Sequence, residues 1–282
     1  FKRIFKKYFM QIGIIGQGFV GNAVYQKFKK YYNIKTYDIK SKLSTSTEQE
    51  VLDNDIIFIC LPTPMNKDGS CYIGIVEAAI KRVFEFGVAK TVVIKSTVPP
   101  GTTSKWNKQF KSIDIIFNPE FLTEANAVSD YEKQTRIILG GPRQSTTKLK
   151  PIFKKAFPNA DIIKTDSTYA EMVKYITNSF LATKVSFANE MYQICERLDV
   201  DYDKVIEYAT YDDRLGKSHW SVPGPDGDFG YGGHCFPKDI QALISVAENL
   251  GIFPEMLIST DEKNNEVRKN RDWEKMKGRA IV

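Results

Sequence analysis

The sequence predicts an α/β protein: a doubly wound parallel sheet followed by a mainly helical domain with one long helix. From Met10 to about Thr165, short apolar and β-branched runs alternate with helical patterns, which is typical of βαβ units. After Asp166 the pattern becomes helical and stays so almost to the end. We therefore expect one domain over residues 1–166 and a second over residues 167–282.

Seven strands are expected in the first domain, each a short run rich in Ile, Val and Phe. They are Gln11–Ile15, Ile34–Tyr37, Asp55–Cys60, Thr91–Ser96, Asp114–Phe117, Arg136–Leu139 and Asp161–Lys164. Because strands joined through helices run parallel, helices should cover both faces of this sheet.

The long helix is expected from Ser167 to near Leu198, with shorter helices at Tyr202–Ala209, Asp239–Leu250 and Pro254–Arg268. Its length exceeds what one small domain needs, so it should form a spine between domains or subunits. Leu215–Lys238 is a loop rich in Gly and Pro, and a loop of that length indicates a function.

The composition excludes several classes of protein. Hydrophobic residues make up 42% and charged residues 26%, as in soluble globular proteins, and no apolar run reaches the roughly 20 residues of a membrane span. The net charge of +6 is too diffuse for nucleic-acid binding but suits an anionic ligand. Four separated cysteines and two histidines predict reduced thiols in a cytoplasmic protein, with no metal site.

Residues 1–9 form the densest basic stretch, in which Lys and Arg alternate with aromatic residues. Such a stretch is either a membrane-surface anchor or a solvated extension before the first strand. We expect the extension, because the stretch is too short and too charged to span a bilayer.

A glycine-rich turn between the first strand and its helix predicts a dinucleotide site. Its residues are Gly16, Gln17, Gly18, Phe19, Val20 and Gly21. The glycines allow a tight turn, close approach of a pyrophosphate, and close packing of helix and strand. Asp38 ends the second strand, where a carboxylate accepts hydrogen bonds from a ribose 2′-hydroxyl and repels a 2′-phosphate. NAD is favoured, although Lys35 and Lys40 leave NADP open.

The third and fourth strands end in turns that contain Pro62 and Thr63, and Ser96 and Thr97. Open α/β sheets bind ligands at the carboxyl ends of their strands, so we expect these four residues beside the cofactor. The alternative is that they form ordinary strand-end turns.

Cys235 lies in the run Gly230–Asp239, just before a predicted helix that Asp239 could cap. Backbone amides, the helix N-terminus and Lys238 would favour the thiolate, which is the nucleophilic form. The alternative is a buried, inert cysteine, as we expect for Cys60 and Cys195.

These motifs resemble those of the UDP-glucose/GDP-mannose dehydrogenase family, in the family order and over nearly the whole chain. The matching blocks are Gly16–Gly21, Cys60–Pro64, Ile94–Thr103, Asn118–Leu122, Glu171–Phe180 and Gly230–Asp239. The resemblance implies a Rossmann domain that binds NAD, a central helix used in dimerisation, and a further Rossmann-like domain that holds UDP. It therefore also implies a homodimer through the central helix. The chain ends at Val282, near where that further domain would begin, so we expect a short form that lacks it, either naturally or through truncation. Ala125 and His234 depart from the family pattern.

The resemblance also implies roles for individual residues. Cys235 would be the nucleophile, Lys174 and Asn178 would stabilise oxyanions, Thr97 and Asp239 would hold a water, and Glu120 would serve hydrolysis. Glu124 would join the cofactor site. The substrate residues would be Glu120, Phe121, Leu122, Lys174, Asn178, Arg214, Lys217 and Gly232. The implied reaction is the NAD-dependent four-electron oxidation of a nucleotide sugar, UDP-glucose to UDP-glucuronate, through a Cys235 thiohemiacetal and thioester.

Two other functions remain open at this point. A two-electron 3-hydroxyacid-type dehydrogenase also pairs a Rossmann domain with a helical lysine and an asparagine four residues on, but has no use for Cys235. A non-catalytic nucleotide-binding protein is the other alternative.

Overall fold

The computed structural model describes residues 10–282, which divide into two compact units. Unit 1 comprises residues 10–63 and 73–174, and unit 2 comprises residues 64–72 and 175–282. The basic stretch of residues 1–9, with its two interpretations, lies outside the described residues. Within residues 10–282, no helix is both long enough and apolar enough to cross a membrane.

Unit 1 contains a seven-stranded sheet in the order β2-β1-β3-β4-β5-β6-β7. The strands are β1 (Gln11–Ile15), β2 (Asn33–Tyr37), β3 (Ile56–Ile59), β4 (Thr91–Ile94), β5 (Asp114–Phe117), β6 (Arg136–Gly140) and β7 (Asp161–Thr165). All seven predicted strands are confirmed. The first five pair parallel, whereas β6 meets β5 antiparallel through Phe117 and Gly140, and β7 then pairs parallel with β6. The sheet is therefore mostly, not wholly, parallel.

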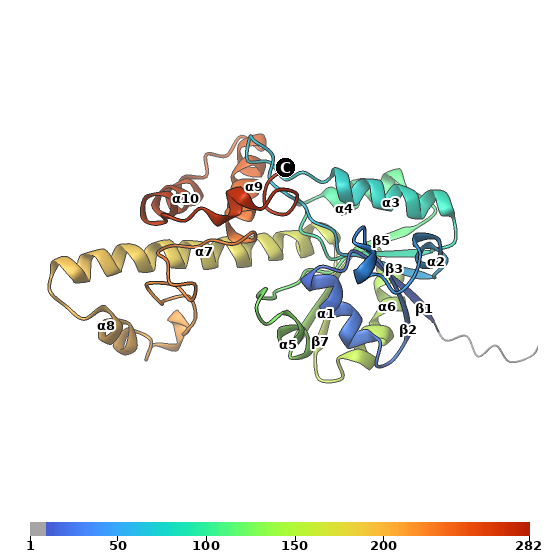
Figure 1. The fold of residues 1–282 in the computed structure, drawn as a ribbon, viewed down its shortest axis with the longest axis horizontal. Coiled ribbons are helices and arrows are strands. Elements are labelled where there is room, and N and C mark those ends of the chain that lie inside the picture. Colours follow the sequence, from blue (N-terminus) through green and yellow to red (C-terminus); the bar gives the residue numbers. More distant parts are fainter. Residues whose placement is uncertain (1–9) are drawn as a thin grey trace, which may run out of the picture. The chain divides into compact units, whose positions relative to one another are not determined.

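Helices cover both faces of this sheet, as the alternating pattern predicts (Figure 1). One face packs on α1 (Phe19–Phe28), α5 (Ala127–Glu132) and α6 (Arg143–Ala156). The other packs on α2 (Glu48–Leu52), α3 (Gly74–Phe86) and α4 (Thr102–Gln109). Along β3, Ile56 and Phe58 face the first set of helices while Ile57 and Ile59 face the second. Successive side chains of a strand point to opposite faces of the sheet, so each strand contributes buried side chains to both faces.

The long helix α7 (Ser167–Arg197) has 31 residues, which confirms the predicted long helix. Its residues up to Lys174 belong to unit 1 and the remainder to unit 2. In unit 2 it leaves large apolar side chains exposed at spacings of four and seven residues, which places them on one side of the helix. These are Ile176 (56% exposed), Phe180 (67%), Phe187 (50%) and Ile194 (46%).

Unit 2 packs three more helices with α7: α8 (Tyr202–Ala209), α9 (Phe236–Asn249) and α10 (Glu255–Val267). The prediction for α9 was wrong at its start, because the helix begins at Phe236 with Cys235 as its N-cap residue. Pro237 stands in the first turn, where its missing N–H leaves no helical hydrogen bond unmade. Asp239 consequently lies inside the helix and does not cap it.

Candidate functional site

The glycine turn of unit 1 has the geometry of a dinucleotide site. Gly16 has a φ of +93°, and its N–H donates to the carbonyl of Tyr37 over 2.8 Å. A Cβ on Gly16 would lie 2.5 Å from the carbonyl oxygen of Cys60, and one on Gly21 would lie 1.9 Å from that of Gly16. Both positions therefore require glycine. Around Gly18 nothing lies within 4 Å of a Cβ position, so the backbone there is open to a ligand.

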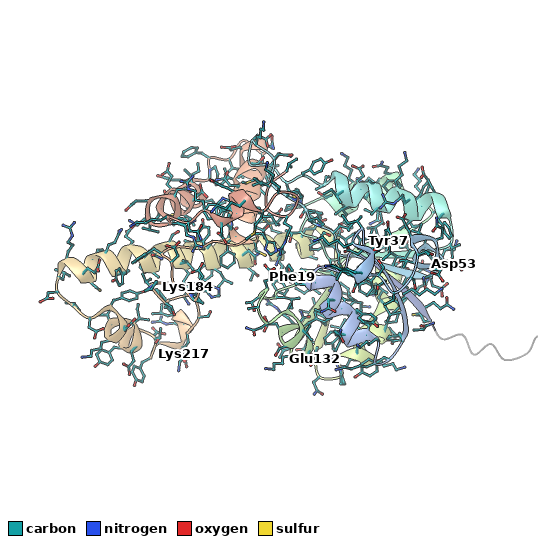
Figure 2. The ribbon with its side chains drawn as sticks, viewed as in Figure 1. Phe19, Tyr37, Asp53, Glu132, Lys184 and Lys217 are labelled. Carbon is teal, nitrogen blue, oxygen red and sulfur yellow. The ribbon has the colours of Figure 1, made fainter. Side chains whose placement is uncertain are left out.

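Asp38 is held directly against this turn. Its Oδ2 accepts the backbone N–H of Gln17 over 2.7 Å, and its Oδ1 accepts that of Lys40 over 2.8 Å. The first turn of α1, which begins at Phe19, contains no acidic residue, so no side chain of that turn neutralises the positive end of the helix dipole. An open turn, a helix N-terminus and a carboxylate at the end of β2 fit NAD. Figure 2 labels Phe19 at the start of α1 and Tyr37 at the end of β2.

The turns after β3 and β4 are tied to each other. The Ser96 hydroxyl donates to the carbonyl of Leu61 over 2.6 Å and accepts its N–H over 3.0 Å. The Thr63 hydroxyl donates to the carbonyl of Thr97 over 2.7 Å. These bonds bring the predicted residues Pro62, Thr63, Ser96 and Thr97 together at the carboxyl ends of neighbouring strands.

Glu120 and Lys174 form a buried ion pair in unit 1. The Lys174 Nζ lies 3.0 Å from Glu120 Oε1 and donates to the Glu120 carbonyl over 2.6 Å. Burial raises the pKa of Glu120, but the charge of Lys174, the amide of Leu122 and the charge of Lys95 lower the pKa more, so it stays below its usual range. Glu120 is therefore a carboxylate at neutral pH, and its pairing fixes the Lys174 ammonium group.

Lys95 is a buried cation that the sequence reasoning missed. Its side chain donates to Asn118 Oδ1 over 2.8 Å and to the Pro119 carbonyl over 3.4 Å, and it stands 5.2 Å from the centre of the Tyr131 ring. Burial lowers the pKa of Lys95 to about 8. The only signal in the sequence is a lysine that directly follows the apolar run of β4.

In unit 2, Cys235 stands half-buried at the N-terminus of α9. Lys238, in the first turn, is 8% exposed and pairs with Asp239. Burial lowers the pKa of Lys238, but Asp239, Cys71 and Cys235 raise it more, so its pKa lies above the usual range and it stays protonated. Asn178 donates to the other oxygen of Asp239 over 2.6 Å. A fixed cation and a helix N-terminus both favour a thiolate.

The other predicted core cysteines differ from Cys235. Cys195 is buried, and burial of the Cys60 thiol raises its pKa to about 12. A thiol of that kind stays protonated and inert at neutral pH.

Three side chains from elsewhere in the chain hold the turn before Cys235, namely the buried Asn189 and Asn264 and the half-buried Asp272. The N–H of Gly230 donates to Asn189 Oδ1 over 3.1 Å, and that of Tyr231 donates to Asn264 Oδ1 over 2.7 Å. Asn264 returns a bond to the Tyr231 carbonyl over 3.0 Å. Asp272 accepts the N–H of Gly233. The sequence reasoning missed these three side chains, because nothing local in the sequence connects them with the turn.

The remaining predicted substrate residues occupy different surroundings. In unit 1, Phe121 lies beneath Lys174, whose Nζ is 5.6 Å from the ring centre. Leu122 is buried, and Glu124 is exposed. In unit 2, the Arg214 guanidinium pairs with Asp212 and its side chain is 89% exposed. Lys217, labelled in Figure 2, is exposed. The two residues before it are held by Lys184 of α7, whose ammonium group donates to the carbonyl groups of residues 215 and 216.

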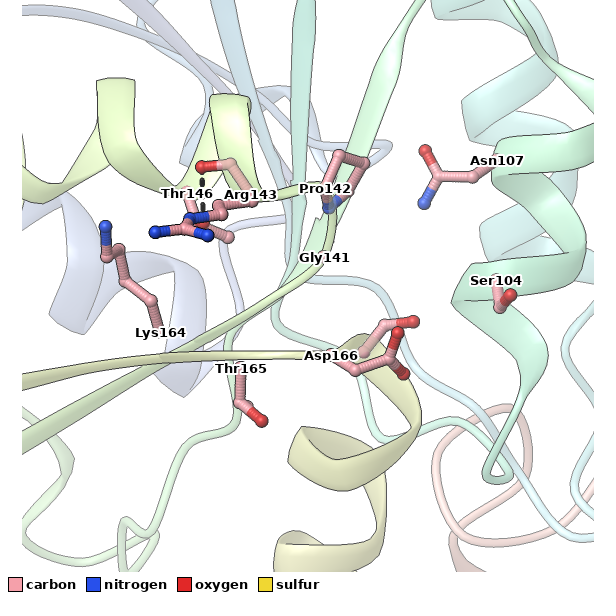
Figure 3. A pocket seen from close by; sticks show the side chains of 10 residues that line it. Ser104, Asn107, Gly141, Pro142, Arg143, Thr146, Lys164, Thr165 and Asp166 are labelled. Carbon is pink, nitrogen blue, oxygen red and sulfur yellow. Dashed lines mark hydrogen bonds between the residues drawn. The ribbon is translucent and has the colours of Figure 1, made fainter.

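Unit 1 also contains a pocket of about 640 Å³ where the ends of β6 and β7 meet α4 and the starts of α6 and α7 (Figure 3). Its lining includes Asn107, Arg143, Lys164 and Asp166. None of the predicted site residues lines it, so it is not the site that the motifs predict.

Together, the doubly wound sheet, the glycine turn and Asp38 define unit 1 as a dinucleotide-binding domain of the Rossmann class. Residues 27–157 match the model of the NAD binding domain of the UDP-glucose/GDP-mannose dehydrogenase family, and residues 168–266 match that of its central domain. The chain belongs to the UDP-glucose/GDP-mannose dehydrogenase family. The family resemblance and the NAD-binding domain expected from the sequence are thereby confirmed.

Individual relatives support the same conclusion. The chain is 37% identical over 240 residues to UDP-glucose 6-dehydrogenase TuaD of Bacillus subtilis, covering 81% of this chain and 49% of the relative. It is 30% identical over 305 residues to UDP-glucose 6-dehydrogenase AglM of Haloferax volcanii, covering 91% and 70%. A UDP-glucose dehydrogenase from Pyrobaculum islandicum superposes with a TM-score of 0.83 at 28% identity, covering 93% and 69%. The chain spans about half the length of its Bacillus relatives.

Proposed function

We propose that this chain catalyses the NAD-dependent four-electron oxidation of a nucleotide sugar, UDP-glucose to UDP-glucuronate, with Cys235 as covalent nucleophile. The observation that carries the proposal is the half-buried thiol at the N-terminus of α9, one turn from the protonated Lys238. The names of the relatives support the substrate.

The cofactor site in this proposal is built from the open glycine turn. Asp38 would accept the ribose hydroxyls, and the helix N-terminus would face the pyrophosphate. When bound, NAD accepts a hydride in each of the two oxidations. The residues proposed for this site are Gly16, Gly18, Phe19, Val20, Gly21, Asp38, Pro62, Thr63, Ser96, Thr97 and Glu124.

The first oxidation converts the primary alcohol to an aldehyde. The alcohol loses a proton as its carbon loses a hydride, and a water held by Thr97 and Asp239 takes that proton. Lys174 and Asn178 donate hydrogen bonds to oxygens that gain negative charge, and each donor of this kind contributes about 3 kcal/mol to the transition state.

The thiol then keeps the aldehyde on the protein. The Cys235 thiolate adds to the carbonyl carbon and forms a thiohemiacetal, which loses the second hydride to become a thioester. Water attacks the thioester with Glu120 as the assisting carboxylate, which releases the acid and restores the thiol. Arg214, Lys217, Phe121, Leu122 and Gly232 are proposed to contact the nucleotide sugar.

We further propose that the chain is a cytoplasmic homodimer with domains at residues 1–166 and 167–282. The apolar side of α7 supports the dimer, because large apolar side chains exposed along one side of a helix often mark an interface. A self-complementary helix is a common element of such two-fold contacts.

The test is to supply NAD and UDP-glucose and to count NADH per sugar consumed. Two NADH per sugar and a glucuronate product support the proposal, whereas one NADH per sugar contradicts it and favours a two-electron dehydrogenase. Cys235→Ser should abolish the complete reaction. Cys195→Ala, which removes a buried thiol elsewhere in unit 2, should leave the stoichiometry unchanged.

A further inference from the structure

Arg268 is a buried guanidinium at the end of α10 that the mechanism above does not use. Its side chain is 1% exposed and lies 2.8 Å from Asp226, 3.5 Å from Asp272 and 3.7 Å from Asp228. It also donates to the carbonyl of Asn270 over 2.8 Å. Burying an unpaired cation is costly, so these three carboxylates and the carbonyl together hold the guanidinium in one place.

This guanidinium lies directly against the turn that precedes Cys235. A Cβ on Gly232 would be 2.2 Å from Arg268 Nη2 and 2.5 Å from Asp272 Oδ1. Only a glycine backbone can approach the ion pair this closely. The same contact means that any movement of the guanidinium changes the space available to the turn.

Asp272 links the ion pair to the turn by hydrogen bonds. Its two carboxylate oxygens accept the N–H of Gly233 over 3.1 and 3.0 Å, while Oδ1 also faces Arg268. Gly233 has a φ of +71°, in the left-handed region, and it precedes Cys235 by two residues. Asp272 therefore fixes the backbone at the point where the chain turns into α9.

We propose that Arg268 is a positioning residue for Cys235: through Asp272 it fixes the Gly232–Gly233 backbone and so aims the thiol at the N-terminus of α9. Without the guanidinium, Asp226, Asp228 and Asp272 lose their common counterion and repel one another. Asp272 then moves towards water and releases Gly233. The contribution to catalysis rests on the proposed function, whereas the effect on the thiol does not.

The planar shape of the guanidinium contributes to this positioning role as well as its charge. Arginine presents five N–H donors in a planar arrangement, so it can serve several carboxylates and a carbonyl at once. A lysine carries the same charge at one atom and can replace only part of this arrangement.

The experiment measures the alkylation of Cys235 by iodoacetamide across a range of pH, with the site identified by peptide mass spectrometry. The variants are Arg268→Gln and Arg268→Lys. Arg271→Gln is the matched control, since Arg271 is 43% exposed and pairs with Glu274 three residues on. In Arg268→Gln the alkylation profile should move to higher pH by about one unit, because the thiol leaves the helix N-terminus and Lys238. Arg268→Lys should recover part of the shift, and Arg271→Gln should match the wild type.

Turnover of UDP-glucose gives a second readout. In Arg268→Gln, kcat should fall about tenfold or more with KM little changed, because a small misplacement of a reacting group costs up to about 100-fold. Asp272→Asn keeps an acceptor for the Gly233 N–H but loses the charge, so its alkylation profile should move to higher pH by less than that of Arg268→Gln. This variant tests the proposal if Arg268→Gln does not fold.

A purely structural role predicts a different result. Folded Arg268→Gln or Asp272→Asn protein with the wild-type alkylation profile and kcat would overturn the proposal. If the wild type itself does not oxidise UDP-glucose, the proposed function fails while the alkylation profiles still decide the role of Arg268.

Discussion

Glu171, in the first turns of α7, is the carboxyl group whose replacement by glutamine gives the sharpest test of the energetics of unit 1. Its side chain is fully buried, and its two oxygens accept the N–H groups of Gly101 over 2.6 Å and Thr103 over 2.8 Å. These bonds tie the start of α4, and the loop that carries Thr97, to α7. Burial raises the pKa of Glu171 to about 7, although the hydrogen bonds from Thr103 and Gly101 lower it.

The sign of the pH dependence follows from this raised pKa. The ordinary pKa of 4.5 applies to the unfolded chain, so the folded protein binds the proton of Glu171 more tightly than the unfolded chain does. The stability that this group contributes is therefore fully present below its ordinary pKa and is lost as the pH rises through about 7. Between about pH 5 and about pH 8 the loss amounts to about 2.5 kcal/mol of unfolding free energy.

Glu171→Gln removes this titration. Glutamine retains one acceptor but turns an N–H₂ towards an amide donor, which costs about 1–3 kcal/mol at low pH. The wild type should therefore be the more stable protein at about pH 5, and its advantage should shrink by about 2.5 kcal/mol by about pH 8.

Urea unfolding measures this difference. Trp106 is buried in α4, whose start Glu171 holds, and the other two tryptophans, Trp220 and Trp273, lie in unit 2. With Trp220→Phe and Trp273→Phe in both proteins, the fluorescence of Trp106 reports unit 1 alone. The difference between the two midpoints should change by about 1 M urea over this pH range. A difference that stays constant, or that grows in favour of the wild type as the pH rises, would refute the reasoning.

Three further predictions concern other parts of the chain. Asp38→Asn should reduce the preference for NAD over NADP about tenfold or more, because the charge that repels a 2′-phosphate is lost. Fluorescence titration with both cofactors measures this preference, and an unchanged preference would contradict the prediction. Lys174→Met should lower the free energy of unfolding in urea by about 3–5 kcal/mol, because Glu120 remains buried without its paired cation. Adding Glu120→Gln to this variant should restore part of the lost stability, and a loss below about 1 kcal/mol in Lys174→Met would count against a buried ion pair. Phe180→Asp should convert the proposed dimer to monomers, as measured by light scattering, whereas Tyr208→Asp should not, since Tyr208 is similarly exposed but lies on α8. Equal masses for the two variants would argue against an interface through α7.

The fold was largely predictable because its signals are local. The strands of unit 1 are short runs such as Ile56–Ile59, buried on both faces, and the helical period after Asp166 is long enough to be unambiguous. The start of α9 was not predictable from that period, since Pro237 suggests a boundary although proline is well tolerated in a first helical turn.

The site was predictable only where its residues share a motif. The glycine turn and Asp38 follow a spacing set by βαβ geometry, and their contact in the structure agrees with it. Lys95 and Arg268 lacked such a signal. Asn118 and Asp226 lie 23 and 42 residues along the chain from these two cations and meet them only through tertiary packing. Asp272 is four residues from Arg268, but nothing in that spacing indicates that the pair is buried.

The covalent role of Cys235 is tested most directly by trapping the sugar on the protein. Glu120→Gln, which should slow hydrolysis of the thioester, is mixed with NAD and UDP-glucose, quenched in acid and digested for peptide mass spectrometry. The account predicts a sugar acyl group on the peptide that contains Cys235, and its disappearance in the additional Cys235→Ser variant. Full conversion to glucuronate with no adduct at Cys235, or an adduct on another cysteine, would contradict it.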